Sequence, residues 1–197
     1  MSTHSRFMKL AAAAAAVAGL SGCTPDFAKD NTSPVLFIIA DINGGSPLDS
    51  DVLSGDATSG FFIAPDQVPV TIAVRPKNPN FENVPQIAGA VLITRYEVRY
   101  FRSDGRAAEG VDVPFRISGN LSTAADVGTD SAQNVTLAIE VVRRQAKLEP
   151  PLRNLVGGGG EIVLTCFAEI TIHGRTIAGQ AVQAQGRLQI DFADLVD

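Results

Sequence analysis

From Val35 onward, the apolar residues of this chain occur in short runs rich in β-branched side chains, separated by clusters of Gly, Pro, Asn and Asp. Runs of this kind are typical of β-strands joined by turns. Helical periodicity is nearly absent, so the chain lacks the helices that connect the strands of a parallel sheet. The pattern therefore predicts an all-β fold, an antiparallel β-sandwich of about seven to eight strands. The expected strands are 35–42, 60–64, 68–75, 91–102, 111–117, 135–144, 161–173 and 180–192.

The strand expected at 91–102 alternates strictly, so its two faces are read directly from the sequence. The set expected to face the core is Leu92, Thr94, Tyr96, Val98 and Tyr100, and the outward set is Ile93, Arg95, Glu97, Arg99 and Phe101. The segment 173–179 has a glycine near each end, Gly174 and Gly179, which predicts a hairpin that pairs the last two strands.

The length and composition of the chain fit one folded domain behind a leader. The 197 residues are 45% hydrophobic and 19% charged, a balance that supports a buried core rather than disorder. We expect the β-sandwich domain to span 35–197. Cys166 alternates with apolar residues in its strand, which predicts a buried, free thiol.

The first 22 residues have the layout of an export signal. A polar start with Arg6 and Lys9 is followed by an apolar run over 10–20. That run of 11 residues is shorter than the roughly 20 that a membrane-spanning helix needs. We therefore expect 1–22 to be a cleaved leader.

The segment Leu20-Ser21-Gly22-Cys23 resembles the lipobox of bacterial lipoproteins. The resemblance implies cleavage before Cys23, a diacylglycerol on its thiol and an acyl chain such as palmitate on its amine. It also implies that Thr24 favours the outer membrane where the cell has one, with the domain facing the periplasm or the cell surface. Residues 23–34 are then a lipidated N-terminus and a flexible tether. The alternative is an ordinary secretory leader cut near Ala or Gly, with Cys23 incidental.

The segment 93–100, followed by Asp104-Gly105, resembles the central strand and turn of fibronectin type III and related immunoglobulin-like domains. The resemblance implies an immunoglobulin-like β-sandwich. Such domains usually carry a core tryptophan, whereas this chain has no Trp.

The charge and histidine content narrow the classes of function. Without the leader, 14 basic residues face 21 acidic ones, a net charge of −7 that disfavours a nucleic-acid partner. The only histidines are His4, in the leader, and His173, expected at the entry to the hairpin. Because a histidine-based triad or multi-histidine metal site cannot be assembled, we expect no enzyme, catalytic residue or cofactor.

Three further segments have a functional and a structural interpretation. The acidic residues of 41–56 offer oxygen ligands for calcium, but Asp and Asn also form turns, which is the favoured interpretation. Arg95, Arg99 and Arg102 with Glu97 form either a partner-binding patch or a solvated face. The basic stretch 143–153 is either a site for an acidic ligand or, as we favour, a link crossing between two sheets. The four glycines of 157–160 predict a flexible loop rather than a phosphate site.

These features favour a membrane-anchored envelope lipoprotein that acts as a non-enzymatic binding or scaffold module. Its expected partner is an envelope protein or a surface polymer, bound by a sheet face, an edge strand or end loops. The alternative is a solute-binding or accessory lipoprotein of a transport or enzyme complex, for which a deep polar pocket with converging carboxylates would be the sign.

Overall fold

The computed structural model of the chain describes residues 33–56, 58, 60–77, 90–128 and 133–195. The leader expected at 1–22, the expected lipidation site Cys23 and the part of the expected tether up to residue 32 lie outside these residues. No helix in the described part of the chain is long and apolar enough to cross a membrane.

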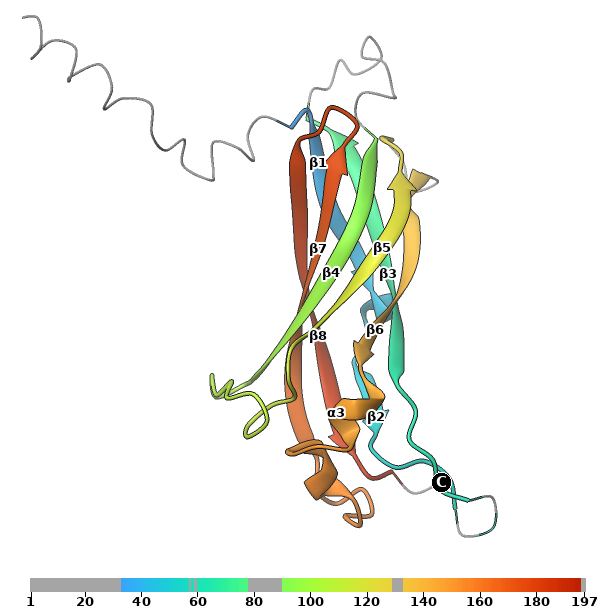
Figure 1. The fold of residues 1–197 in the computed structure, drawn as a ribbon, viewed down its shortest axis with the longest axis vertical. Helices are drawn as coiled ribbons and strands as arrows, with labels where there is room; N and C mark the ends of the chain where they lie inside the picture. Colours follow the sequence, from blue (N-terminus) through green and yellow to red (C-terminus); the bar gives the residue numbers. More distant parts are fainter. Residues whose placement is uncertain (1–32, 57, 59, 78–89, 129–132, 196–197) are drawn as a thin grey trace, which may run out of the picture. The chain divides into compact units, whose positions relative to one another are not determined.

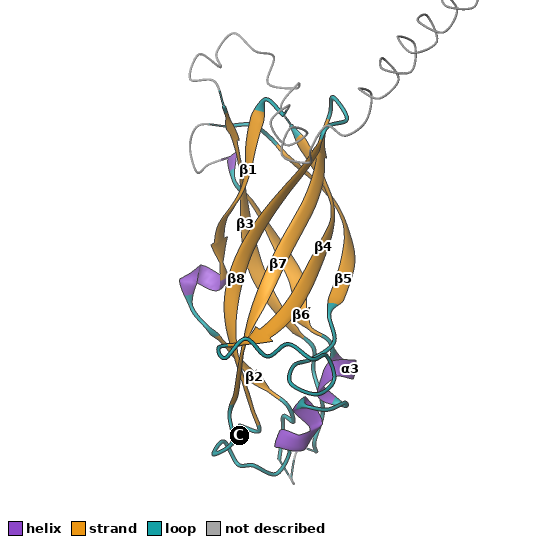
Figure 2. Cartoon of the chain, turned by 90° about the vertical axis from the view of Figure 1, so that its left-hand side faces the viewer, coloured by secondary structure: helices purple, strands orange, loops and turns teal. Residues whose placement is uncertain are grey.

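The described residues form eight strands in two sheets, which confirms the all-β fold (Figures 1 and 2). The three-stranded sheet has the order β1 (Val35–Ile42), β3 (Asp66–Pro76) and β6 (Val135–Val142). The five-stranded sheet has the order β2 (Leu48–Asp51), β8 (Ala181–Ala193), β7 (Leu164–Thr176), β4 (Val91–Arg102) and β5 (Ile117–Ala125). The short helical turns are η2 (Asn43–Gly45), α3 (Arg144–Lys147) and η6 (Leu152–Leu155).

One strand pair corrects the expectation of a wholly antiparallel fold. β2 runs parallel to β8, with Leu48 opposite Ile190 and Asp51 opposite Ala193. β2 was not among the expected strands, because its sequence LDSD has one apolar residue and reads as a turn. Its Ser50 faces the interior and is fully buried.

Two expected strands are wrong in position. Within 60–64 only Phe62 forms a β-bridge, with two backbone hydrogen bonds to Ser54. This segment belongs to neither sheet. The strand expected at 111–117 begins only at Ile117, because residues 108–113 close a hydrogen-bonded turn and Pro114 has no N–H to donate.

A β-bulge in β4 reverses the expected faces at the start of that strand. Between Ile93 and Arg95 the register slips by one residue against β7. Ile93 is therefore fully buried and Leu92 is 47% exposed, opposite to the expectation from alternation. Beyond the bulge, the inward positions of Tyr96, Val98 and Tyr100 agree with it.

The core lies between the two sheets and draws side chains from both. Tyr100 of β4 donates a hydrogen bond to the backbone carbonyl of Val141 in β6, so a polar contact also joins the sheets. Cys166 is a free, buried cysteine, as expected, and burial raises the pKa of its thiol to about 11. The thiol is therefore protonated and unreactive at neutral pH.

Candidate functional site

The outer face of the five-stranded sheet carries a grid of polar and charged side chains. Cross-strand registers place Arg95 beside His173, Glu97 beside Thr171, Arg99 beside Glu169, and Phe101 beside Phe167. The next column, on β8, consists of Gln183, Gln185, Arg187 and Gln189. We call these twelve residues the outer face.

Direct contacts order part of the outer face. Arg187 lies 3.7 Å from the carboxylate of Glu169 and 5.2 Å from the ring centroid of Phe101. The rings of Phe101 and Phe167 stack at 5.6 Å between centroids. This half-buried aromatic pair, bordered by a cation, offers both apolar area and charge, as protein-binding surfaces do.

His173 lies within β7, not at the entry to the turn as expected, because β7 continues to Thr176. Its Nε2 is 3.7 Å from Glu97 and is buried without a hydrogen bond to any described residue. Partial burial lowers the pKa of His173, and Arg95 adds to this effect, while Glu97 opposes it. The imidazole is therefore mostly neutral near pH 7.

The structure separates the four residues of the charged patch expected on this sheet. Arg95, Glu97 and Arg99 lie on the outer face, and Arg95 pairs with Glu97 at 3.0 Å. Arg102 stands opposite Cys166, a core-facing position, at the end of β4. Arg102 therefore does not belong to the outer face.

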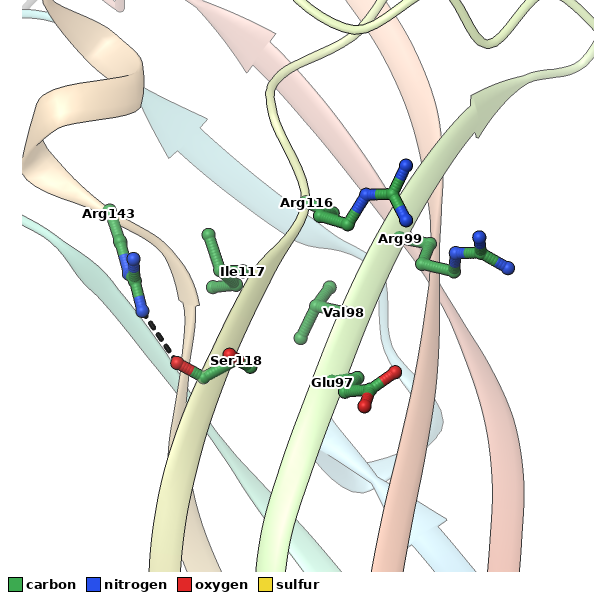
Figure 3. A pocket seen from close by; sticks show the side chains of 7 residues that line it. All are labelled: Glu97, Val98, Arg99, Arg116, Ile117, Ser118 and Arg143. Carbon is green, nitrogen blue, oxygen red and sulfur yellow. Dashed lines mark hydrogen bonds between the residues drawn. The ribbon is translucent and has the colours of Figure 1, made fainter.

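At the β5 side of the outer face, a cavity of about 300 Å³ opens beside β4 (Figure 3). We call it the arginine cleft, because three of its lining residues are arginines. The lining residues are Glu97, Val98, Arg99, Arg116, Ile117, Ser118 and Arg143.

Three separate segments supply these arginines. Arg99 comes from the middle of β4, Arg116 from the chain just before β5, and Arg143 from the connection between β6 and α3. Arg99 and the stretch beginning at Arg143 are separate candidates in the sequence, and the fold brings them to one cavity. Arg116 was not among the expected site residues, because it lies in the misplaced strand 111–117 and no motif surrounds it.

Two of the three guanidinium groups are held by neighbouring groups. Arg143 donates to the backbone carbonyl of Ser118 at 2.6 Å and lies 3.4 Å from Glu140. Arg116 donates through Nε to Glu109 at 2.7 Å. Fixed guanidinium groups are suited to recognise planar or tetrahedral oxyanions.

The basic stretch 143–153 does form the expected link between the sheets, since it connects β6 of one sheet to β7 of the other through α3 and η6. The loop of four glycines at 157–160 follows this link. The Gly157 amide donates a hydrogen bond to the Asp194 carboxylate at 2.6 Å, which holds the start of the loop.

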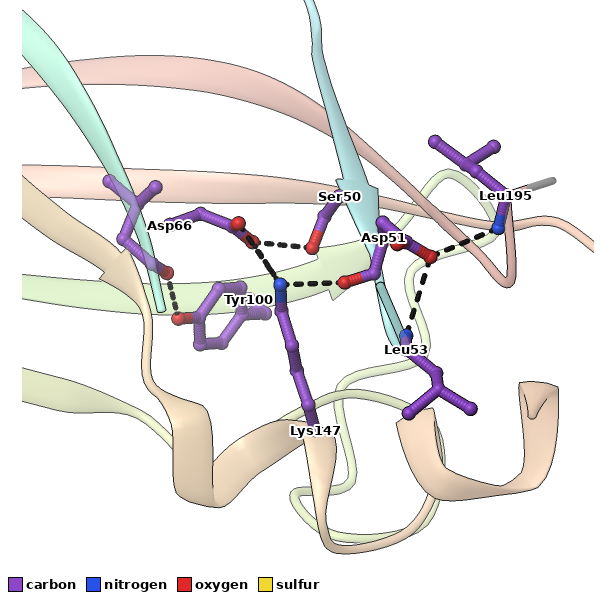
Figure 4. Close-up of polar contacts among 8 residues, drawn as sticks. Ser50, Asp51, Leu53, Asp66, Tyr100, Lys147 and Leu195 are labelled. Atoms are coloured by element: carbon purple, nitrogen blue, oxygen red, sulfur yellow. Dashed lines mark hydrogen bonds and ion pairs between the residues drawn. The ribbon is translucent and has the colours of Figure 1, made fainter. Parts of the chain in front are cut away.

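The acidic stretch 41–56 is engaged with its own chain. Asp41 accepts a hydrogen bond from the amide of Gly44, and Asp56 accepts one from Thr58. Asp51 accepts bonds from the amides of Leu53 and Leu195 (Figure 4). Among the described residues, no group of three or more His, Cys, Asp or Glu side chains is placed to hold a metal ion.

Next to Asp51 lies a buried polar network (Figure 4). The Lys147 ammonium donates to the Asp51 carbonyl at 2.7 Å and to the Asp66 carboxylate at 3.0 Å. Ser50 donates to the same carboxylate at 2.5 Å. This network joins α3, β2 and β3, so its role is to hold the end of the sandwich together.

Comparison of the chain with protein-family models, curated proteins and solved structures found no match.

Proposed function

We propose that this chain is a bacterial lipoprotein, cut before Cys23 and lipidated there, whose β-sandwich is a non-enzymatic binding module of the cell envelope. The observation that carries the proposal is the Leu20-Ser21-Gly22-Cys23 segment directly after an 11-residue apolar run. Several acyl chains on one residue give a stable membrane anchor. The outer membrane, facing the periplasm or the cell surface, is the proposed location.

We further propose that the domain is immunoglobulin-like. The strand orders support this assignment: β1, β3 and β6 follow the order of strands A, B and E, and β8, β7, β4 and β5 follow that of G, F, C and C′. β2 has no place in that seven-strand scheme and extends the sheet beyond β8.

The proposed partner is an envelope protein or a surface polymer, and the outer face with the arginine cleft is the proposed contact surface. The stacked phenylalanines, the charged columns and the fixed guanidinium groups support a binding role. The cleft is lined by a single carboxylate, Glu97, rather than by the converging pair that acid–base hydrolysis uses.

The position of the first described residues supports access to this surface. The start of β1 lies at the same end of the sandwich as the turn between β7 and β8, whereas α3 and η6 lie at the other end (Figure 1). The proposed tether 23–34 would span about 40 Å at full extension. A tether of this length would let the outer face turn toward a neighbouring molecule of the envelope.

The anchor is tested by expressing the full chain with Cys23→Ser and with Cys166→Ser as the matched control. Metabolic labelling with palmitate and mass spectrometry of the processed N-terminus should find lipid on the parent and on Cys166→Ser, and none on Cys23→Ser. A mature N-terminus that begins elsewhere, or a Cys23 with a free thiol, contradicts the proposal.

The contact surface is tested by photo-crosslinking in the anchored protein. A crosslinker at Arg95 or Gln185 on the outer face should give discrete products, and one at Thr71 or Ala138 on the three-stranded sheet should not. Equal products from both sheets would contradict a binding role of the outer face.

A further inference from the structure

Arg99 and Arg116 both line the arginine cleft, and in Figure 3 the Arg116 side chain reaches from the β5 side toward β4, from which Arg99 projects. Arg99 has no hydrogen bond or ion pair with any described residue. Its cross-strand neighbour Glu169 is instead paired with Arg187 at 3.7 Å. Arg99 therefore presents a full positive charge with all of its N–H donors available.

The guanidinium of Arg116 has a hydrogen-bond partner at one of its three nitrogen atoms. Its Nε donates to Glu109 at 2.7 Å, which fixes the direction of the side chain. Its two terminal Nη groups have no hydrogen-bond partner among the described residues. Because a guanidinium carries five N–H donors in a planar fork, these groups are free to meet an acceptor.

The two arginines share one cavity whose lining includes a single carboxylate, while Glu109, which pairs with Arg116, lies outside the lining. Glu97, the carboxylate in the lining, is engaged by Arg95 at 3.0 Å. The cavity of about 300 Å³ is at the lower limit for small-ligand sites, and a carboxylate or phosphate group fits within it. An oxyanion there would accept charge-assisted hydrogen bonds from both arginines.

We propose that the arginine cleft is an oxyanion-binding site, in which Arg99 and Arg116 bind a carboxylate or phosphate group. The inference deepens the proposed function and rests on it for the source of the ligand, which the binding partner presents. Recognition is by the paired guanidinium forks rather than by net charge, since the chain beyond the leader carries −7.

The experiment uses the chain from residue 23 with Cys23→Ser, titrated with inorganic phosphate and separately with glutarate. The backbone amide and arginine Nε signals are followed by NMR. At constant ionic strength, we expect saturable shifts at Arg99, Arg116 and Ser118. Saturation by phosphate alone assigns a phosphate ligand, and saturation by glutarate alone assigns a carboxylate. Sodium chloride should give no saturable shift at these residues.

Matched variants identify the donors. Arg99→Gln and Arg116→Gln should each weaken binding about 10-fold, and Arg99→Lys should not restore it, because lysine lacks the planar fork. Arg175→Gln, at an exposed position near the end of β7 and outside the cleft lining, should leave binding within about twofold. The spectrum of each variant reports whether its fold is kept.

The proposal is overturned if neither anion gives a saturable shift, if chloride reproduces the shifts, or if Arg175→Gln weakens binding as much as Arg99→Gln. These outcomes are independent of lipidation, since the titrated protein carries no lipid. A failure of oxyanion binding is therefore distinguishable from a failure of the anchor at Cys23.

Discussion

The side-chain ammonium of Lys147 lies 3.0 Å from the carboxylate of Asp66, and the lysine side chain is only 2% exposed. Asp66, with 18% exposure of its side chain, keeps limited access to water. A charge this deeply buried is tolerated because Asp66 and the Asp51 carbonyl both accept hydrogen bonds from it.

Replacing Lys147 by Met should lower the free energy of unfolding by about 3 kcal/mol, because it leaves the Asp66 carboxylate without its cation. Urea denaturation measures this loss. The exposed neighbour is the control, and Arg144→Met should change stability by less than about 0.5 kcal/mol. Equal midpoints for the parent and Lys147→Met would show that the pair does not stabilise the fold.

The buried tyrosines Tyr96 and Tyr100 should make the free energy of unfolding depend on pH in the alkaline range. Burial raises the pKa of Tyr100, and burial together with Glu140 raises the pKa of Tyr96. Above about pH 10 the folded state therefore holds more protons than the unfolded chain, so the free energy of unfolding falls as pH rises. Urea midpoints at increasing pH should decline there.

Phenolate absorbance in the same titration should appear together with unfolding rather than before it. Tyr100→Phe removes one of the two titrating phenols and also the bond to the Val141 carbonyl, which should lower stability by about 1 kcal/mol at neutral pH. Full phenolate absorbance from a protein that is still folded near pH 10 would contradict the burial of these rings.

Gly119 stands against the ring of Tyr96. A Cβ at this position would lie 2.3 Å from Cε1 and 2.7 Å from the hydroxyl oxygen of that buried ring. Gly119→Ala should therefore destabilise the fold by about 2 kcal/mol, measured as a shift of the urea midpoint. Asn120→Ala, at an exposed neighbouring position, is the control and should be close to neutral. An unchanged urea midpoint for Gly119→Ala would mean that the Tyr96 ring can move aside to make room for the added methyl group.

The pKa of His173, the only histidine besides His4, should lie below its ordinary value of about 6.5. Because the unfolded chain takes up this proton first as pH falls, stability should decline from about pH 6.5 downward. A ¹H NMR titration measures the pKa directly. Arg95→Gln should raise it and Glu97→Gln should lower it further. A midpoint above 6.5 would show that the Glu97 charge outweighs burial.

Strands with long, regular alternation were predicted from the sequence. β1 and β4 have the expected bounds, and the interior positions of Cys166, Ala168 and Ile170 in β7 follow the expected alternation. The reason is that side-chain direction in a strand is a local property with a period of two. The outward positions of Arg95, Glu97 and Arg99 were predictable for the same reason.

Features that depend on distant parts of the chain were not predictable. β2 exists because β8 supplies a partner about 140 residues later, and the bulge after Ile93 depends on how β4 meets β7. The arginine cleft likewise needs the approach of Arg116 and Arg143 to Arg99. No local pattern around Arg116 contains that information.

The parallel pairing of β2 with β8 sets an order for assembly. Leu48 emerges early in synthesis, yet its partner Ile190 follows only after nearly all the other described residues have been made. Closing so long a loop makes the pairing a late event. The described sheets are therefore complete only when β8 has been synthesised and released, and a chain interrupted before β8 leaves both β2 and β7 with open edges exposed to proteolysis and aggregation.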